Sequence, residues 1–200
     1  MNSIKQTRFF AQNYPNLQGL RVLPSALFLL VTTLWANLQQ GPARDLTLPL
    51  LVGLGCLVLY LLINGFYNRV YGRVKRTISH AEMFLSSACT ILALAAFIFD
   101  SSDTLSVSLL GLVFAAVFAF TGFWYWRPVT VLFAINLGLA LLLALLSLLP
   151  LFGVQEWWRF LGLKHSLLAF SFLYGVFGIL GGIFAHIYFV QSLPASPEAE

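Results

Sequence analysis

Long, uninterrupted runs of apolar residues dominate the hydrophobic pattern of this chain. Six of them lie at about residues 20–38, 47–68, 81–99, 105–123, 129–149 and 166–190. Each is close to the ~20 residues that an α-helix needs to cross the hydrocarbon core of a bilayer. The runs are too continuous for membrane β-strands, in which lipid-facing and lumen-facing residues alternate. The pattern therefore predicts an all-α, polytopic membrane bundle of about six transmembrane helices.

Composition supports a membrane protein over a soluble domain. Apolar residues make up 60% of the 200 residues and charged residues 9%, with a mean hydropathy of +0.87. A soluble domain carries about 25% charged residues. The chain divides into a polar N-terminal segment (1–19), a transmembrane domain (20–190) and a polar tail (191–200). The connections are short, and the segment from Gln155 to His165 has the pattern either of a short helix on the outer surface or of an early turn of the last transmembrane helix.

Basic residues predict how the bundle is oriented. Eight fall on one side of the predicted helices, namely Lys5, Arg8, Arg21, Arg69, Arg73, Lys75, Arg76 and Arg127. Three fall on the other side, namely Arg44, Arg159 and Lys164. Because loops rich in lysine and arginine stay in the cytoplasm, both termini are expected there. The expected location is a plasma membrane, of the prokaryotic cytoplasmic-membrane kind.

Small residues form seams on two of the predicted helices. The 105–123 run carries Gly111, Ala115, Ala119 and Gly122, and the 166–190 run carries Ser171, Gly175, Gly178 and Gly182. Each set occupies one face of its helix. Small residues let membrane helices pack closely. The seams therefore serve either packing inside one protomer or a contact with a second copy or another membrane protein.

Polar residues inside the runs gather near the predicted cytoplasmic boundary. Tyr60, Asn64, Tyr67 and Tyr71 recur at helical spacing on one face, and Asn64, Glu82, Asn136 and His186 lie within ~12 Å of that boundary. Polar groups in a membrane usually face the protein interior and often mark a functional site. The candidate ligand-binding residues are Tyr60, Asn64, Tyr67, Glu82, Asn136 and His186, around a pocket open to the cytoplasm. The outer half offers fewer polar residues, such as Thr32, Thr33 and Ser147.

Each of these residues also has a purely structural interpretation. His186 suits a neutral histidine bonded to a neighbouring helix. Ser79 and Glu82 have the spacing of a helix capping box. The tyrosines suit the membrane–water interface. The basic residues Arg69, Arg73, Lys75 and Arg76 suit either a topology signal or contacts with anionic lipid headgroups.

The sequence carries no motif for catalysis or for a cofactor. It contains no HExxH, GxSxG or paired acids, and Cys56 and Cys89 do not form a CxxC pair. No metal or cofactor is expected, and the net charge of +4 does not suggest nucleic-acid binding. We expect a non-enzymatic accessory or scaffold subunit, or a lipid- or small-molecule-binding module, with membrane lipids as partners. The alternative is a small oligomeric transporter or channel.

Overall fold

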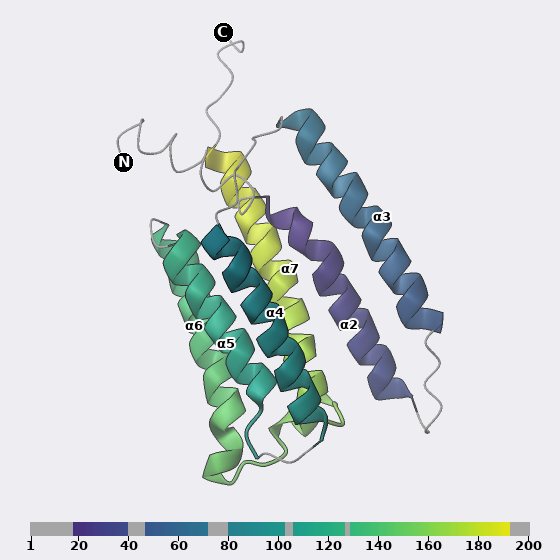
Figure 1. Ribbon diagram of the computed structural model, residues 1–200, viewed down its shortest axis with the longest axis vertical. Helices are drawn as coiled ribbons and strands as arrows, with labels where there is room; N and C mark the ends of the chain where they lie inside the picture. The colour runs from purple at the N-terminus through teal and green to yellow at the C-terminus, as the bar shows by residue number, and fades with distance from the viewer. Residues whose placement is uncertain (1–17, 40–46, 72–79, 103–105, 127–128, 193–200) are drawn as a thin grey trace.

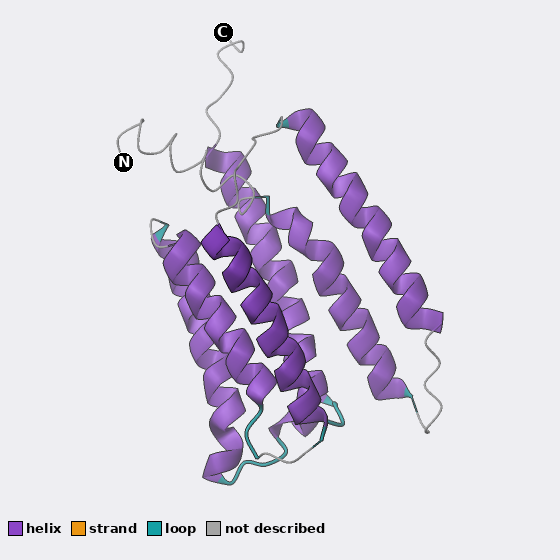
Figure 2. Cartoon of the chain, viewed as in Figure 1, coloured by secondary structure: helices purple, strands orange, loops and turns teal. Residues whose placement is uncertain are grey.

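The computed structural model describes residues 18–39, 47–71, 80–102, 106–126 and 129–192 (Figure 1). All regular structure in these ranges is helical (Figure 2). The six long helices are α2 (Leu23–Leu38), α3 (Thr47–Val70), α4 (His80–Ser101), α5 (Leu109–Thr121), α6 (Thr130–Leu148) and α7 (Ser166–Ser192). They correspond one to one with the six apolar runs, which confirms the all-helical bundle.

Short helical turns complete the long helices. The 3₁₀ turn η1 (Gly19–Val22) leads into α2, and the π-helical turn η2 (Gly122–Trp126) extends α5. After α6 come the 3₁₀ turns η3 (Leu149–Phe152) and η4 (Trp157–Leu161). The second of these lies in the segment predicted to be a short surface helix. Gly153 and Gly162 end the two turns with φ of 86° and 70°, a conformation that glycine adopts without strain.

Five helical segments are long and apolar enough to cross a membrane. They are Gly19–Leu38, Thr47–Val70, Met83–Ser101, Thr130–Phe152 and Ser166–Gln191. The sixth apolar segment, Leu109–Trp124, is shorter. This count of five to six agrees with the predicted number of transmembrane helices. In lipid, a helix satisfies its own backbone hydrogen bonds, which is why such runs adopt this one structure.

Successive helices run in opposite directions, so the bundle has two ends (Figure 1). We call them the Gly19 end, where α2 begins and α7 ends, and the Asp100 end, where α4 ends and α5 begins. Helix α7 is central, because it packs against η1, α2, α4, α5 and α6. Helix α3 lies at the margin, against α2 and η1.

The buried apolar side chains form two clusters. One, towards the Gly19 end, comprises Tyr67, Trp126, Leu132, Ala185 and Phe189. The other comprises Ala96, Leu110, Ala115, Leu143 and Phe170. Most leucines of α3 are exposed, as suits a helix that faces lipid, and Tyr67 is the residue that α3 buries.

The small-residue seams pack inside the chain. Gly175 and Gly178 lie against Ala26 of α2, and Gly182 lies against the backbone of Gly19. A Cβ added at Gly182 would stand 2.6 Å from the Gly19 carbonyl oxygen, so this contact requires glycine. On α5, Gly111 lies against the Phe170 ring. Both seams are therefore engaged within one protomer, and assembly with a second copy through them stays a prediction.

Candidate functional site

A buried tyrosine connects α3 to α7 near the Gly19 end. Tyr67 has 0% of its surface exposed, and its hydroxyl lies 2.7 Å from Nδ1 of His186. The two rings also meet edge to face, with centroids 5.7 Å apart. Asn64 is one turn earlier on α3, about 9 Å from the end of that helix. Part of the α3 face that helical spacing predicts therefore makes contacts within the bundle. Tyr67 contacts α7, and Asn64 contacts η1.

Arg21, in the turn η1, reaches across to the same two residues of α3. Its Nη2 donates a hydrogen bond to Oδ1 of Asn64 at 2.5 Å. Its guanidinium carbon lies 5.9 Å from the centre of the Tyr67 ring, within the range of a cation–π contact. The buried Nε of Arg21 has no hydrogen-bond partner. Within the described ranges, this cation forms no ion pair with a carboxylate.

Gln18 lies next to Arg21 in the same turn. The Arg21 amide donates to the Gln18 carbonyl at 3.0 Å, and residues three apart in a 3₁₀ turn eclipse one another. Gln18 is 1% exposed, yet neither Nε2 nor Oε1 of its side chain has a hydrogen-bond partner. A buried polar group left unpaired costs about 1–3 kcal/mol. Such a group needs an explanation, and binding of a polar ligand there would provide one.

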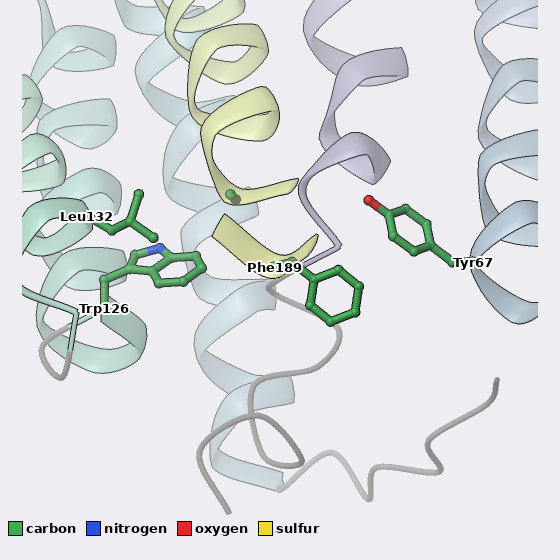
Figure 3. Close-up of a cluster of buried hydrophobic side chains, with 5 residues drawn as sticks. Tyr67, Trp126, Leu132 and Phe189 are labelled. Carbon is green, nitrogen blue, oxygen red and sulfur yellow. The ribbon is translucent and has the colours of Figure 1, made fainter. Parts of the chain in front are cut away.

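We name these five residues, Gln18, Arg21, Asn64, Tyr67 and His186, the Gly19-end cluster. An aromatic layer adjoins it, since the Phe189 and Tyr71 rings lie 5.0 Å apart and each approaches the ring of Tyr67. Figure 3 shows Tyr67 extending from α3 towards the chain near the start of α2, with Phe189 on α7 beside it. The cluster is thus a polar site with an apolar wall.

The structure unites some of the predicted site residues and separates others. Asn64, Tyr67 and His186 come together. Tyr60 is 41% exposed and lies outside the cluster. The Asn136 amide donates to the Leu132 carbonyl of its own helix at 2.8 Å, and its Cβ faces Gly122.

The predicted basic and acidic contacts fall mostly outside the described part. Arg69 is exposed in the last turn of α3. Arg73, Lys75 and Arg76 lie outside the described residues, as does the side chain of Glu82. Their roles as lipid contacts, ligand or helix cap therefore stay predictions.

Two members of the cluster were missed from the sequence. From the sequence, Arg21 is used only to predict orientation, and Gln18 is assigned to the polar N-terminal segment. A signal for both existed: a glutamine and an arginine three residues apart open the first apolar run.

At the Asp100 end, a buried carboxylate holds the start of α5. Asp100 accepts hydrogen bonds from the Leu109 amide at 2.8 Å and the Leu110 amide at 3.0 Å. It also accepts one from the Ser108 hydroxyl at 2.5 Å. These amides lack partners within their own helix, and negative charge is favoured at a helix N-terminus. Asp100 therefore has a structural role, which the sequence had not revealed.

Two cavities adjoin Asp100. The smaller, of about 200 Å³, is lined by Asp100, Ser108, Ser147, Trp157 and Trp158 among others. The larger, of about 620 Å³, lies between α2, α4 and the start of α7. The sequence placed the polar pocket at the opposite end and judged this half poor in polar residues. Several of the few polar residues of this half, among them Thr32, Thr33 and Ser147, line these two cavities.

The part of the chain that the structure describes holds no group of three or more metal-ligating side chains. No protein-family model, curated protein or solved structure matches this chain.

Proposed function

We propose that the chain is a non-catalytic, membrane-embedded binding module of a plasma membrane, which holds an anionic group at the Gly19-end cluster. The observations that carry this proposal are the buried side chain of Gln18 and the buried Nε of Arg21, for both of which the structure gives no hydrogen-bond partner. The two residues lie three apart in one turn, which is why we assign one ligand group to both. An accessory or scaffold subunit is the class of protein that fits such a site.

The charge of the ligand follows from Arg21. Its contacts in the cluster are to neutral groups, Asn64 and the Tyr67 ring. Arg21 is half-buried and has no carboxylate partner among the described residues, and arginine pairs especially well with carboxylate and phosphate. An anionic oxygen would accept hydrogen bonds from Arg21 Nε and from Gln18 Nε2. It would also offset the charge of the guanidinium.

The position of the cluster along the helices indicates where the anion comes from. Asn64 and His186 each lie about 9 Å from the end of their helices. Phospholipid headgroups occupy that boundary, and basic pockets between transmembrane helices bind them. The end concerned is the one expected to face the cytoplasm. The ligand we propose is therefore the phosphate of an anionic phospholipid.

Native mass spectrometry of the protein from nanodiscs tests this. In discs that mix phosphatidylglycerol with phosphatidylcholine, the wild type should retain phosphatidylglycerol after gentle activation. Arg21→Gln should weaken this retention about tenfold or more, since a hydrogen bond to a charged group contributes about 1.5–3 kcal/mol. Arg159→Gln is the control, because it removes one exposed cation outside the cluster and outside the predicted headgroup contacts.

Three results would overturn the proposal. If both variants lost phosphatidylglycerol retention equally, the chain would attract anionic lipid without a specific site. Full retention in Arg21→Gln would place the lipid elsewhere. Displacement of the lipid by millimolar inorganic phosphate would show that the site takes a soluble anion instead.

A small oligomeric transporter is the second candidate. The observation that favours it is the large cavity at the Asp100 end, because α7 contributes residues to both that cavity and the cluster. Proton-dependent uptake into proteoliposomes that His186→Ala abolishes would support transport. Loss of folding in the same variant would instead assign His186 to structure.

A further inference from the structure

The larger cavity at the Asp100 end has the size of a ligand-binding site. Its volume of about 620 Å³ lies within the ~300–1,000 Å³ typical of small-molecule pockets. Helices α2 and α4 both pack on α7, and residues of all three line the space. The cavity is partly open to its surroundings.

The charged and amide side chains of the lining lie at the Asp100 end of the cavity, where it is formed by Gln39, Asp100, Ser101, Lys164 and His165. Farther from that end it is formed by Phe28 and Leu29 of α2, about 15 Å from the end of that helix, and by Phe97 of α4. Hydroxyl side chains also line this part, and that of Thr32 donates to the Phe28 carbonyl of its own helix. An apolar body with a polar rim matches the two parts of an amphiphile.

Lys164 is the lysine of the rim, and among the described residues it has no carboxylate partner. Lys164 Nζ donates to the neutral carbonyl of Gln39 at 3.1 Å. By contrast, Arg159 pairs with Glu156 at 2.7 Å. The Asp100 carboxylate is already engaged by the start of α5. Among the charged groups described at this end, Lys164 is therefore the one that would attract an anion.

The rim is held in place before any ligand binds. Asn37 Nδ2 donates to the Gly162 carbonyl at 3.0 Å, and Asn37 Oδ1 accepts from the Lys164 amide at 3.0 Å. These two bonds tie the loop before α7 to the last turn of α2. A site formed in advance loses less entropy on binding.

We infer that this cavity binds a single-chain amphiphile with an anionic head, a long-chain carboxylate. The tail lies along Phe28, Leu29 and Phe97, and the carboxylate meets Lys164 at the rim. This site stands at the opposite end from the Gly19-end cluster, so it does not depend on the function proposed there.

Trp35 lines the cavity and supplies the probe. The purified protein in phosphatidylcholine nanodiscs is titrated with a stearate brominated in mid-chain, because bromine quenches tryptophan on contact. Saturable quenching is expected in the wild type. Trp35→Phe should remove most of the saturable part, since the remaining four tryptophans do not line this cavity.

Two rim variants test the head of the ligand. Lys164→Gln should weaken the apparent affinity about fivefold, the upper range for an exposed ion pair. Arg159→Gln removes an exposed cation that is already paired at the same end, and should leave the affinity unchanged. The methyl ester of the brominated acid should bind the wild type as weakly as the acid binds Lys164→Gln.

Some outcomes would overturn the inference. Saturable quenching that persists in Trp35→Phe would place the acid outside the cavity. Equal affinities of acid and ester in the wild type would exclude a carboxylate head. Lys164 is exposed, so its variant is expected to fold, and an unchanged elution volume would verify this.

Discussion

The contact between Gly182 of α7 and Gly19 of η1 allows a sharp test of the fold. In Gly182→Ala the new Cβ would stand 2.6 Å from the Gly19 carbonyl oxygen, whereas ordinary contact begins at 3.4 Å. The obstructing atom belongs to the backbone, so no side-chain rotation relieves the clash. The two backbones must separate by about 0.8 Å, which is the difference between those distances.

The adjacent glycine provides the matched control. A Cβ at Gly181 would meet nothing within 4 Å. Both substitutions gain the same helix propensity, which favours alanine by up to about 1 kcal/mol. Their difference therefore isolates the strain of overpacking, which is typically about 1–3 kcal/mol. We expect Gly182→Ala to be less stable than Gly181→Ala by that amount.

Reversible unfolding by SDS in mixed micelles, followed by tryptophan fluorescence, measures this difference. Gly182→Ala should unfold at a lower SDS fraction than Gly181→Ala and the wild type. It should also weaken anionic lipid retention, because η1 carries Arg21 of the Gly19-end cluster. If the two variants unfold together, η1 and α7 are not in backbone contact and the reasoning fails.

Three further variants test other parts of the structure. Asp100→Asn should lose about 1–3 kcal/mol in the same SDS titration, since an amide offers one acceptor oxygen where the carboxylate offers two, and an unchanged midpoint would refute its role at the start of α5. Tyr67→Phe removes the hydroxyl that is hydrogen-bonded to His186, and should lower the free energy of unfolding in the same assay by about 1 kcal/mol. An unchanged free energy of unfolding would contradict this hydrogen bond. Phe160→Cys, 95% exposed at the Asp100 end, should react in a cysteine-free background with an impermeant maleimide added to intact cells. Labelling only after lysis would reverse the predicted orientation.

The helices could be predicted closely, because each depends on local sequence. A run of apolar residues in lipid has one way to satisfy its backbone, so α3 begins at Thr47 as its run does. The start of α5 differs for a tertiary reason. Its run was expected from residue 105, but the helix begins at Leu109, where Asp100 and Ser108 receive the first amides.

The candidate site was predictable only in part. Helical spacing placed Asn64 and Tyr67 on one face, and the seam on α7 pointed His186 towards another helix. Spacing within α3 cannot tell where along that face the neighbouring helix ends, so Tyr60 was included although it is exposed. Gln18 and Arg21 were missed because a single 3₁₀ turn leaves no periodic signal.

The sequence by itself determined the number of long helices, their approximate ends and which faces are small or polar. These features follow from rules that act within one helix or between one helix and the bilayer. Which faces meet was decided by the tertiary structure, because lipid is as apolar as leucine and gives no burial signal along the chain. Close packing of Gly182 on Gly19, and the tie from Asn37 to the Lys164 loop, join residues far apart in sequence. The Gly19-end cluster and the Asp100-end cavity exist only once those distant contacts form.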